Sequence, residues 1–220
     1  MFVKICGITS EEDALLAVAM GADAVGFVFA PSTRQIAPAL AREIARRLPP
    51  EVLTVGVFRD EAPQRVVDIV NGSGLRAAQL HGHETVEQTT WVHGRVPIVI
   101  KAFPSGDPAL DRADRFGADA VLIDSATPGS GEVFDWSLAE GAPIGKRVII
   151  AGGLTPDNVA DAVTRIRPWG VDVSTGVESA PGVKDARLVR DFIRNARGAA
   201  PKGYRGDEDA RPFDWQMEDL

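Results

Sequence analysis

The sequence has almost no cysteine, since Cys6 is the only one in 220 residues. One thiol cannot form an internal disulfide, which excludes the disulfide-stabilised secreted class. The first residues lack the charged-then-apolar order of a signal peptide, so a cytoplasmic protein is expected. Long apolar runs are also missing. The nearest candidate, residues 14–30, is interrupted by Gly21, Asp23 and Gly26, which favours a helix followed by a strand and no membrane partner.

Positive charge and histidine are both scarce. The chain has 24 Lys and Arg against 31 Asp and Glu, a formal net charge of −7. This deficit argues against a nucleic acid partner, because phosphate-backbone binding needs a basic face. Only three histidines are present and none pairs with acids at ligand spacing, so no metal site is expected. A small anionic substrate stays possible if local cations and backbone N–H groups bind it.

Short apolar runs alternate with amphipathic stretches along most of the chain. The apolar runs predict eight strands, at 2–6, 24–29, 53–58, 77–80, 98–102, 120–124, 147–151 and 170–174. The stretches after them predict helices near 11–20, 38–47, 62–71, 84–93, 108–116, 136–140, 156–165 and 184–197. Eight βα units predict an α/β fold, a single-domain (β/α)8 TIM barrel over residues 1–197, because open doubly wound sheets usually stop at five or six strands.

A short repeat agrees with this count. The sequence Gly-Ala-Asp-Ala-Val occurs at 21–25 and again at 117–121, four units apart, as a duplicated half-barrel would give. A preference of αβ loops for Gly and Asp would also produce it. Residues 198–220 have a different character, with an acidic cluster and scattered aromatic residues, and predict a C-terminal tail that either docks through its aromatic residues or is disordered.

The first strand and turn, Lys4-Ile5-Cys6-Gly7-Ile8-Thr9, place the single thiol where a strand ends. The sequence Thr9-Ser10-Glu11-Glu12 is typical of a capping box that opens a helix. In a parallel α/β fold this end of the strands binds ligands. Lys4 and Cys6 should point the same way, and a nearby ammonium favours a thiolate. The alternative is a small buried apolar residue with no chemistry.

Two glycine-containing turns follow the last two strands. Residues 151–157 end a strand in Gly152-Gly153 and, with Thr155 as N-cap, open a helix, and Ser174-Thr175-Gly176 offers a second turn. Loops after strands seven and eight commonly bind phosphate in this architecture. Each turn alone could be merely a tight connection, but two at the expected strands favour phosphate binding.

Other strand ends carry acid, base and cationic groups. Asp124 ends an apolar run, so partial burial would raise its pKa and suit a general acid; it could instead be a helix cap. Arg34 could bind a carboxylate bidentately or could be an ordinary surface arginine. His81 and Lys101 could assist, or could be satisfied polar groups in the barrel mouth.

Taken together, these motifs resemble those of the phosphoribosylanthranilate isomerase family of tryptophan biosynthesis, from residue 4 to about residue 197. The motifs that carry the resemblance are Lys4-Ile5-Cys6-Gly7-Ile8-Thr9, Gly21-Ala22-Asp23, Gly26-Phe27, Gln79-Leu80-His81-Gly82, Leu122-Ile123-Asp124-Ser125, Gly129-Ser130-Gly131, Phe134-Asp135-Trp136, Ala151-Gly152-Gly153-Leu154 and residues 172–178. The resemblance implies a (β/α)8 barrel and a cofactor-free Amadori rearrangement of N-(5-phosphoribosyl)anthranilate.

The resemblance also implies residue roles. Cys6 would be the general base, Asp124 the general acid, and Arg34 the partner of the anthranilate carboxylate. The phosphate would lie between Gly152-Gly153 and the turn that begins at Ser174, which includes Thr175 and Gly176. His81 and Asp172 would line the site. The partner would be a small phosphorylated substrate, and the protein would be a monomer or a homodimer.

Other readings compete with this one. An indole-glycerol-phosphate synthase would be expected to use catalytic lysines, and a pentose-phosphate epimerase metal-binding histidines and aspartates. A non-enzymatic barrel that senses a phosphorylated ligand would keep the glycine turns but has no need for both Cys6 and Asp124. The pair of a cysteine and an aspartate favours the isomerase.

Overall fold

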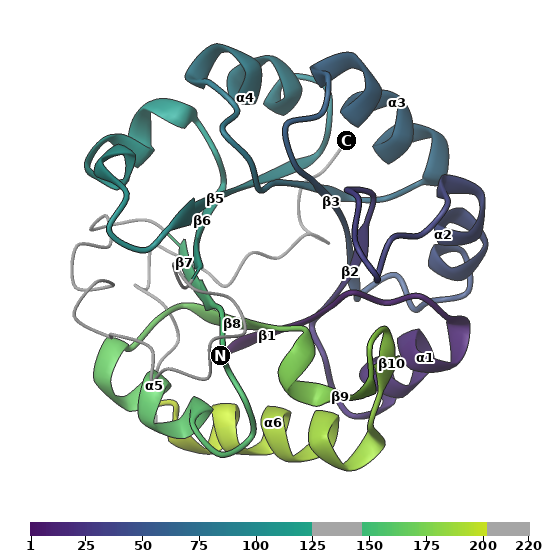
Figure 1. The fold of residues 1–220 in the computed structure, drawn as a ribbon, viewed down its shortest axis with the longest axis vertical. Helices are drawn as coiled ribbons and strands as arrows, with labels where there is room; N and C mark the ends of the chain where they lie inside the picture. Colours follow the sequence, from purple (N-terminus) through teal and green to yellow (C-terminus); the bar gives the residue numbers. More distant parts are fainter. Residues whose placement is uncertain (125–146, 202–220) are drawn as a thin grey trace.

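Eight parallel strands form a closed barrel in the order β1 to β8. The computed structural model describes residues 1–124 and 147–201. The strands are β1 Phe2–Cys6, β2 Ala24–Val28, β3 Leu53–Phe58, β4 Ala77–Leu80, β5 Ile98–Pro104, β6 Ala120–Asp124, β7 Arg147–Ala151 and β8 Gly170–Val173. Figure 1 looks along the barrel, with helices around the strands, and the chain is one domain with the predicted TIM barrel fold.

The helices cover the outside of the barrel. They are α1 Glu11–Ala19, α2 Pro38–Ala45, α3 Pro63–Ser73, α4 Val86–His93, the 3-10 helix η1 Pro108–Phe116, α5 Val159–Ile166 and α6 Ala186–Ala199. The helix predicted near 136–140 and the part of the predicted tail from residue 202 onward lie outside the described residues.

One predicted helix type and two predicted helix caps differ from the structure. The segment 108–116 is a 3-10 helix interrupted at Arg112, whose φ of −124° is not helical. α5 begins at Val159 after a turn, with Asn158 as its N-cap, so Thr155 is not the cap. The cap of α1 is Ser10, which accepts from the backbone N–H of Asp13, because the Thr9 hydroxyl donates to the carbonyl of Gly182.

The core has two layers, as alternation along the strands requires. One set of side chains points into the barrel and forms its own cluster, made of Phe2, Ala24, Leu53, Val55, Ala77, Ile98, Ile100, Ala102, Ala120, Leu122, Ile149 and Ala151. The other set, which includes Ile5, Phe27 and Phe192, packs between the strands and the helices. Filling the barrel with side chains makes it a solid support, so only its ends can bind ligands.

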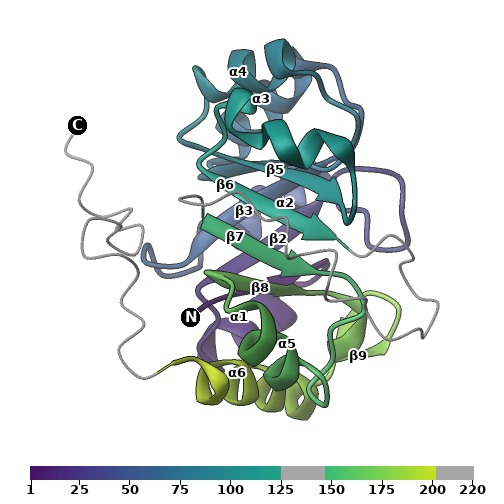
Figure 2. The same cartoon turned by 90° about the vertical axis from the view of Figure 1, so that its left-hand side faces the viewer.

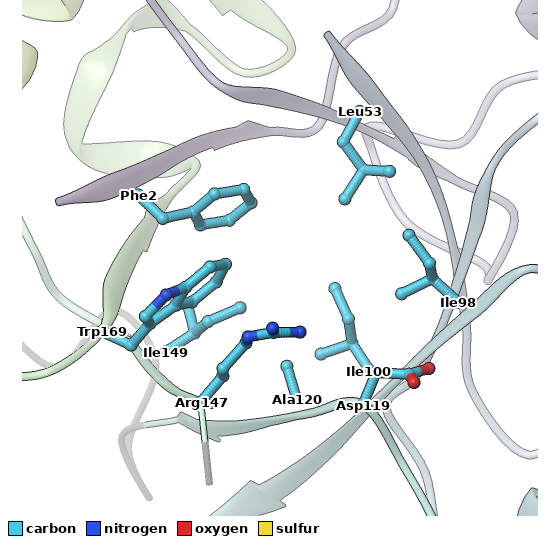
Figure 3. A pocket seen from close by; sticks show the side chains of 9 residues that line it. All are labelled: Phe2, Leu53, Ile98, Ile100, Asp119, Ala120, Arg147, Ile149 and Trp169. Carbon is cyan, nitrogen blue, oxygen red and sulfur yellow. The ribbon is translucent and has the colours of Figure 1, made fainter. Parts of the chain in front are cut away.

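The N-terminal end of the barrel is closed. Phe2 and Trp169 stack there with ring centroids 4.4 Å apart, and the Arg147 guanidinium lies 5.8 Å from the Trp169 ring. Figure 3 shows these side chains around a small void of about 20 Å³, no more than the space of one water molecule. A substrate therefore has to bind at the other end, toward which the strand arrowheads in Figure 2 point.

A short hairpin at that end was not expected from the sequence. After β8 the chain makes a single 3-10 turn, η3 Thr175–Val177, and then two antiparallel strands, β9 Glu178–Ala180 and β10 Val183–Lys184. Strands of three and two residues carry too little alternation to be read from a pattern. The hairpin brings Glu178 and Lys184 back to the mouth of the barrel.

Candidate active site

A cavity of about 580 Å³ lies at the C-terminal end of the barrel strands. All ten residues that the sequence assigns to the site line it: Cys6, Arg34, His81, Asp124, Gly152, Gly153, Asp172, Ser174, Thr175 and Gly176. They come from six of the eight βα units, so only the closed barrel brings them together. Lys101, another candidate from the sequence, is not among the lining residues.

The thiol of Cys6 lies against a buried ion pair on the barrel wall. Lys4 is fully buried, and its Nζ donates to Asp172 Oδ1 at 2.9 Å. A Cβ added to Gly26 would lie 2.8 Å from the Cys6 sulfur and 3.2 Å from Lys4 Nζ. Lys4 and Cys6 therefore face the same side, as alternation predicts, and glycine at position 26 gives them room.

Burial dominates the ionisation of this thiol. The pKa of Cys6 is raised above its ordinary value, because desolvation disfavours the thiolate and Asp172 adds negative charge nearby. Lys4 and Lys184 act in the opposite direction but do not cancel the effect. Lys4 favours the thiolate, as expected, but the pKa of Cys6 is raised overall. The thiolate, once formed, is therefore a strong base.

Asp124 is fixed by a chain of hydrogen bonds on the other side of the cavity. Its Oδ2 lies 3.0 Å from His81 Nε2, and His81 Nδ1 lies 2.9 Å from Gln79 Nε2. The Asp124 side chain is 21% exposed. One carboxylate oxygen is thus occupied by His81, and among residues 1–124 and 147–201 no side chain is hydrogen-bonded to the other. The sequence reading found Asp124 and His81 but not the contact between them.

Arg34 reaches the cavity but is already paired. Its Nε and Nη2 donate to the two oxygens of Glu178 at 2.7 and 2.6 Å. Lys184 Nζ donates to the same carboxylate at 2.9 Å and to the carbonyl of Ser174 at 3.2 Å. Burial alone would raise the pKa of Glu178, but the hydrogen bonds from both cations hold that pKa below its ordinary value. Only the outer edge of the guanidinium remains to bind a ligand.

The two predicted phosphate turns pack against each other. Gly152 and Gly153 have φ of 86° and 63°, in the left-handed region that glycine adopts without strain. A Cβ on Gly176 would collide with the carbonyl of Leu154, so the two turns approach closely only because residue 176 is glycine. The backbone of both turns lines one end of the cavity. Because α5 begins later than predicted, the turns themselves, not a helix end, would supply the N–H donors.

Lys101 has a structural position behind the site. Its Nζ donates to the carbonyls of Leu80, Gly82 and Ala102 at 3.2, 2.8 and 3.0 Å and to Glu84 Oε2 at 2.8 Å. These bonds satisfy the ammonium and fix the backbone on both sides of His81. Of the two alternatives for Lys101, the structure supports the satisfied polar group, although it lies behind the mouth and not inside it.

Comparisons with known proteins agree on one family. The family model described as N-(5'-phosphoribosyl)anthranilate (PRA) isomerase matches residues 3–195. The N-(5'-phosphoribosyl)anthranilate isomerase of Desulforudis audaxviator is 51% identical over 204 residues, which cover 90% of this chain and 98% of that protein. The chain belongs to the PRA isomerase family. Its activity is therefore the conversion of PRA to 1-(2-carboxyphenylamino)-1-deoxyribulose 5-phosphate, an aldose–ketose isomerisation in tryptophan biosynthesis.

Solved structures of PRA isomerases share the fold. The Thermus thermophilus phosphoribosyl anthranilate isomerase has a TM-score of 0.83 and 46% identity, covering 90% of this chain and 99% of that one. Another family structure, at 43% identity, a TM-score of 0.79 and the same coverage, was determined in complex with reduced 1-(o-carboxyphenylamino)-1-deoxyribulose 5-phosphate. The resemblance that the motifs predict is confirmed.

The sequence prediction did not assign Gln79, which lines the cavity, or Glu178 and Lys184, which pair with each other, Glu178 also with Arg34. Gln79 precedes His81 by two positions, the spacing that puts two side chains on the same face of a strand, and this signal was available. Glu178 contacts Arg34 across 144 residues, and no local pattern could reveal that pairing.

Among the described residues, no helix is both long and apolar enough to cross a membrane. Within the same ranges, no three His, Cys, Asp or Glu side chains are grouped as metal ligands would be.

Proposed function

We propose that this isomerase binds PRA with its phosphate at the paired glycine turns and its anthranilate carboxylate at the outer edge of Arg34. The turns at Gly152-Gly153 and at 174–176 line one end of the cavity and Arg34 also lines it. Backbone N–H groups and a guanidinium are suited to these two anionic groups. His81 and Asp172 line the walls between them.

In the first step, Asp124 acts as general acid. It donates a proton to the furanose ring oxygen while the bond from C1 to that oxygen breaks. The lone pair of the anthranilate nitrogen forms a double bond to C1 and gives a protonated Schiff base. Asp124 suits this role because it lines the cavity and His81 fixes one of its oxygens.

In the second step, the thiolate of Cys6 acts as general base. It takes the proton from C2, and the electron pair of that bond forms the C1–C2 double bond of an enolamine while the nitrogen becomes neutral. Tautomerisation moves the enol proton to C1 and leaves a ketone at C2. Substrate and product are isomers, so no redox partner enters the balance, and the chemistry is assigned to side chains alone, with no cofactor.

One observation carries this proposal more than any other. Cys6 at the end of β1 and Asp124 at the end of β6 line the same cavity as both glycine turns and Arg34. A phosphate sensor would need the turns only, and a lysine-dependent synthase would need free lysines. Lys4 and Lys101 are instead held by Asp172 and Glu84.

The test replaces each of the two groups by a near-isosteric residue of the wrong acidity. Cys6→Ser and Asp124→Asn should each lower kcat by about 10²–10⁴-fold, the contribution of general acid–base catalysis. Turnover is followed by the loss of anthranilate-type fluorescence with PRA generated in situ. Both variants should still bind the reduced product analogue, because phosphate and carboxylate are bound elsewhere. Near-normal turnover of Cys6→Ser would refute the base assignment.

We also propose that the enzyme acts as a monomer or a homodimer in the cytoplasm. A Thermotoga maritima relative is described as a dimeric phosphoribosylanthranilate isomerase from which monomers were generated. A single cysteine is consistent with a reducing compartment. Light scattering at micromolar concentration and cell fractionation measure the two properties, and a higher oligomer or a membrane-bound fraction would contradict them.

A further inference from the structure

Gln79 is buried on β4 with one of its two polar atoms unpaired. The residue is 1% exposed, and within residues 1–124 and 147–201 its Oε1 is the one buried side-chain nitrogen or oxygen that lacks a hydrogen-bond partner. A buried amide oxygen without a partner is destabilising, so its retention needs a reason. The other end of the amide gives one, because Nε2 lies 2.9 Å from His81 Nδ1.

The amide nitrogen fixes the tautomer of His81. With Nε2 of the amide facing the ring, the carboxamide donates, so His81 Nδ1 accepts and carries no proton, whereas the opposite orientation of the amide would put Oε1 there and reverse the tautomer. The ring proton is then on Nε2, which donates to Asp124 Oδ2 at 3.0 Å. The three side chains form one directional chain of hydrogen bonds from Gln79 to Asp124.

Resting on the roles proposed above, we propose that Gln79 is a positioning residue that keeps His81 neutral, with its proton on Nε2, and so holds Asp124 ready to donate. An imidazolium would place an Nδ1–H opposite the amide N–H, donor against donor. It would also put a positive charge 3.0 Å from Asp124, which favours the carboxylate over the acid that the first step needs. The cost of the unpaired Oε1 is offset by a neutral, oriented histidine.

The charges around His81 do not by themselves decide its state. The charged or titratable groups that line the same cavity are Arg34, Arg59, Asp124, Asp172 and Cys6. Behind the loop, Lys101 lies against the carbonyls of Leu80 and Gly82 and is neutralised by Glu84. Charges of both signs therefore surround the ring, whereas the amide nitrogen of Gln79, 2.9 Å from Nδ1, faces the ring directly and disfavours a proton on Nδ1.

The first measurement is made on the unmodified enzyme. Side-chain ¹⁵N NMR of the three histidines, with His81 assigned by loss of its signals in His81→Ala, should show a protonated Nε2 and an unprotonated Nδ1 at pH 7. An Nδ1–H tautomer or an imidazolium at pH 7 would overturn the inference, and this outcome leaves the assignment of Cys6 and Asp124 intact. Full turnover of Asp124→Asn would instead refute the proposed catalytic roles, and the tautomer of His81 would still stand as an independent result.

The second measurement removes the donor and keeps the shape. In Gln79→Met, His81 should lose its fixed Nε2–H tautomer, so that signals of both tautomers appear, and kcat should fall about 10–100-fold, the scale of losing catalytic orientation. KM should stay within about 3-fold, because the substrate anions are bound elsewhere. Gln64→Met is the matched control, because Gln64 is exposed on α3 and its amide donates to Asp68. This substitution should change neither the His81 signals nor kcat nor KM.

The third measurement asks whether Gln79 acts through His81. In a His81→Ala background, Gln79→Met should lower kcat by less than about 2-fold, because coupled residues are not additive. An equal loss in both backgrounds, or a loss of kcat with the His81 tautomer unchanged, would show a general packing role and overturn the proposal.

Discussion

At the scale of single residues, the chemistry rests on the balance between burial and charge at Cys6. Desolvation raises the pKa of the thiol. Lys4 lowers that pKa only in part, because its Nζ also donates to Asp172 at 2.9 Å. A thiol with a higher pKa is less often present as the thiolate at neutral pH, but its thiolate removes a carbon-bound proton more readily. General base catalysis depends on the balance between these two effects. The thiolate fraction should increase with pH through the pKa of Cys6 while the fraction of Asp124 that keeps its proton decreases, so the pH profile of kcat/KM reports macroscopic values of both groups.

This balance predicts the reactivity of the thiol. Alkylation of native enzyme by iodoacetamide should have a pH midpoint above the roughly 8.5 of a free cysteine. Cys6 is the only thiol in the chain, so the rate reports one site. The same protein in concentrated urea is the control and should return to the free value. A native midpoint below that of the unfolded chain would show that the lysines, not burial, dominate.

At the scale of elements, the repeated Gly-Ala-Asp sequence has a single structural role. The Asp23 carboxylate accepts from the backbone N–H of Val3 at 2.7 Å, and the Asp119 carboxylate accepts from that of Val99 at 2.7 Å. The backbone N–H of Asp23 also donates to the carbonyl of Val3 at 2.9 Å, and that of Asp119 donates to the carbonyl of Val99 at 2.9 Å. The repeat therefore ties β2 to β1 and β6 to β5 in the same way, which explains why it recurs four units apart.

Strands were easier to predict than helices, for a physical reason. A buried parallel strand is apolar throughout, so the bounds of β1, β3, β4, β6 and β7 were predicted to the residue. The start of a helix depends on which polar side chain accepts from its first free N–H groups. At α1 this residue is Ser10, because the Thr9 hydroxyl donates to the carbonyl of Gly182 in the turn between β9 and β10. The strand ends and the loops after them also located the ten predicted site residues, all of which line the cavity. The contact between Arg34 and Glu178 depends on a hairpin of five strand residues, and local sequence does not encode it.

That contact gives a prediction for stability. Glu178→Ala should lower the free energy of unfolding by about 3 kcal/mol or more, because it leaves the buried Lys184 ammonium and Arg34 without their carboxylate. Urea denaturation followed by fluorescence measures it. Glu11→Ala is the matched control: Glu11 also receives two hydrogen bonds from an arginine, Arg47, but at an exposed surface, and should change the midpoint little. Equal effects would show that burial of the Glu178 pair is unimportant.

At the scale of the whole molecule, the barrel closes on itself before the chain ends. α6 returns to the start of the fold, where Arg197 Nη2 donates to the carbonyl of Gly21 at 2.7 Å and to Asp23 at 3.1 Å. The family match ends at residue 195, and 98% of the Desulforudis relative fits within 90% of this chain. Every residue assigned to the cavity also precedes α6. These facts support the proposed division into a catalytic barrel and a C-terminal extension.

The division predicts the effect of shortening the chain. Because α6 runs to Ala199, two residues past the predicted boundary, an enzyme ending after Pro201 keeps the whole helix. Its kcat/KM for PRA should stay within a few-fold of the full chain, and its Tm should be unchanged. An enzyme ending after Arg190 is the contrasting control, because it also loses the fully buried Phe192 and the buried Ile193. Removing side chains of this kind costs several kcal/mol, so this shorter form should unfold at a markedly lower temperature. If the chain ending after Pro201 lost activity to the extent expected for Cys6→Ser, the last 19 residues would have to contribute to the site or to an assembly that the site needs.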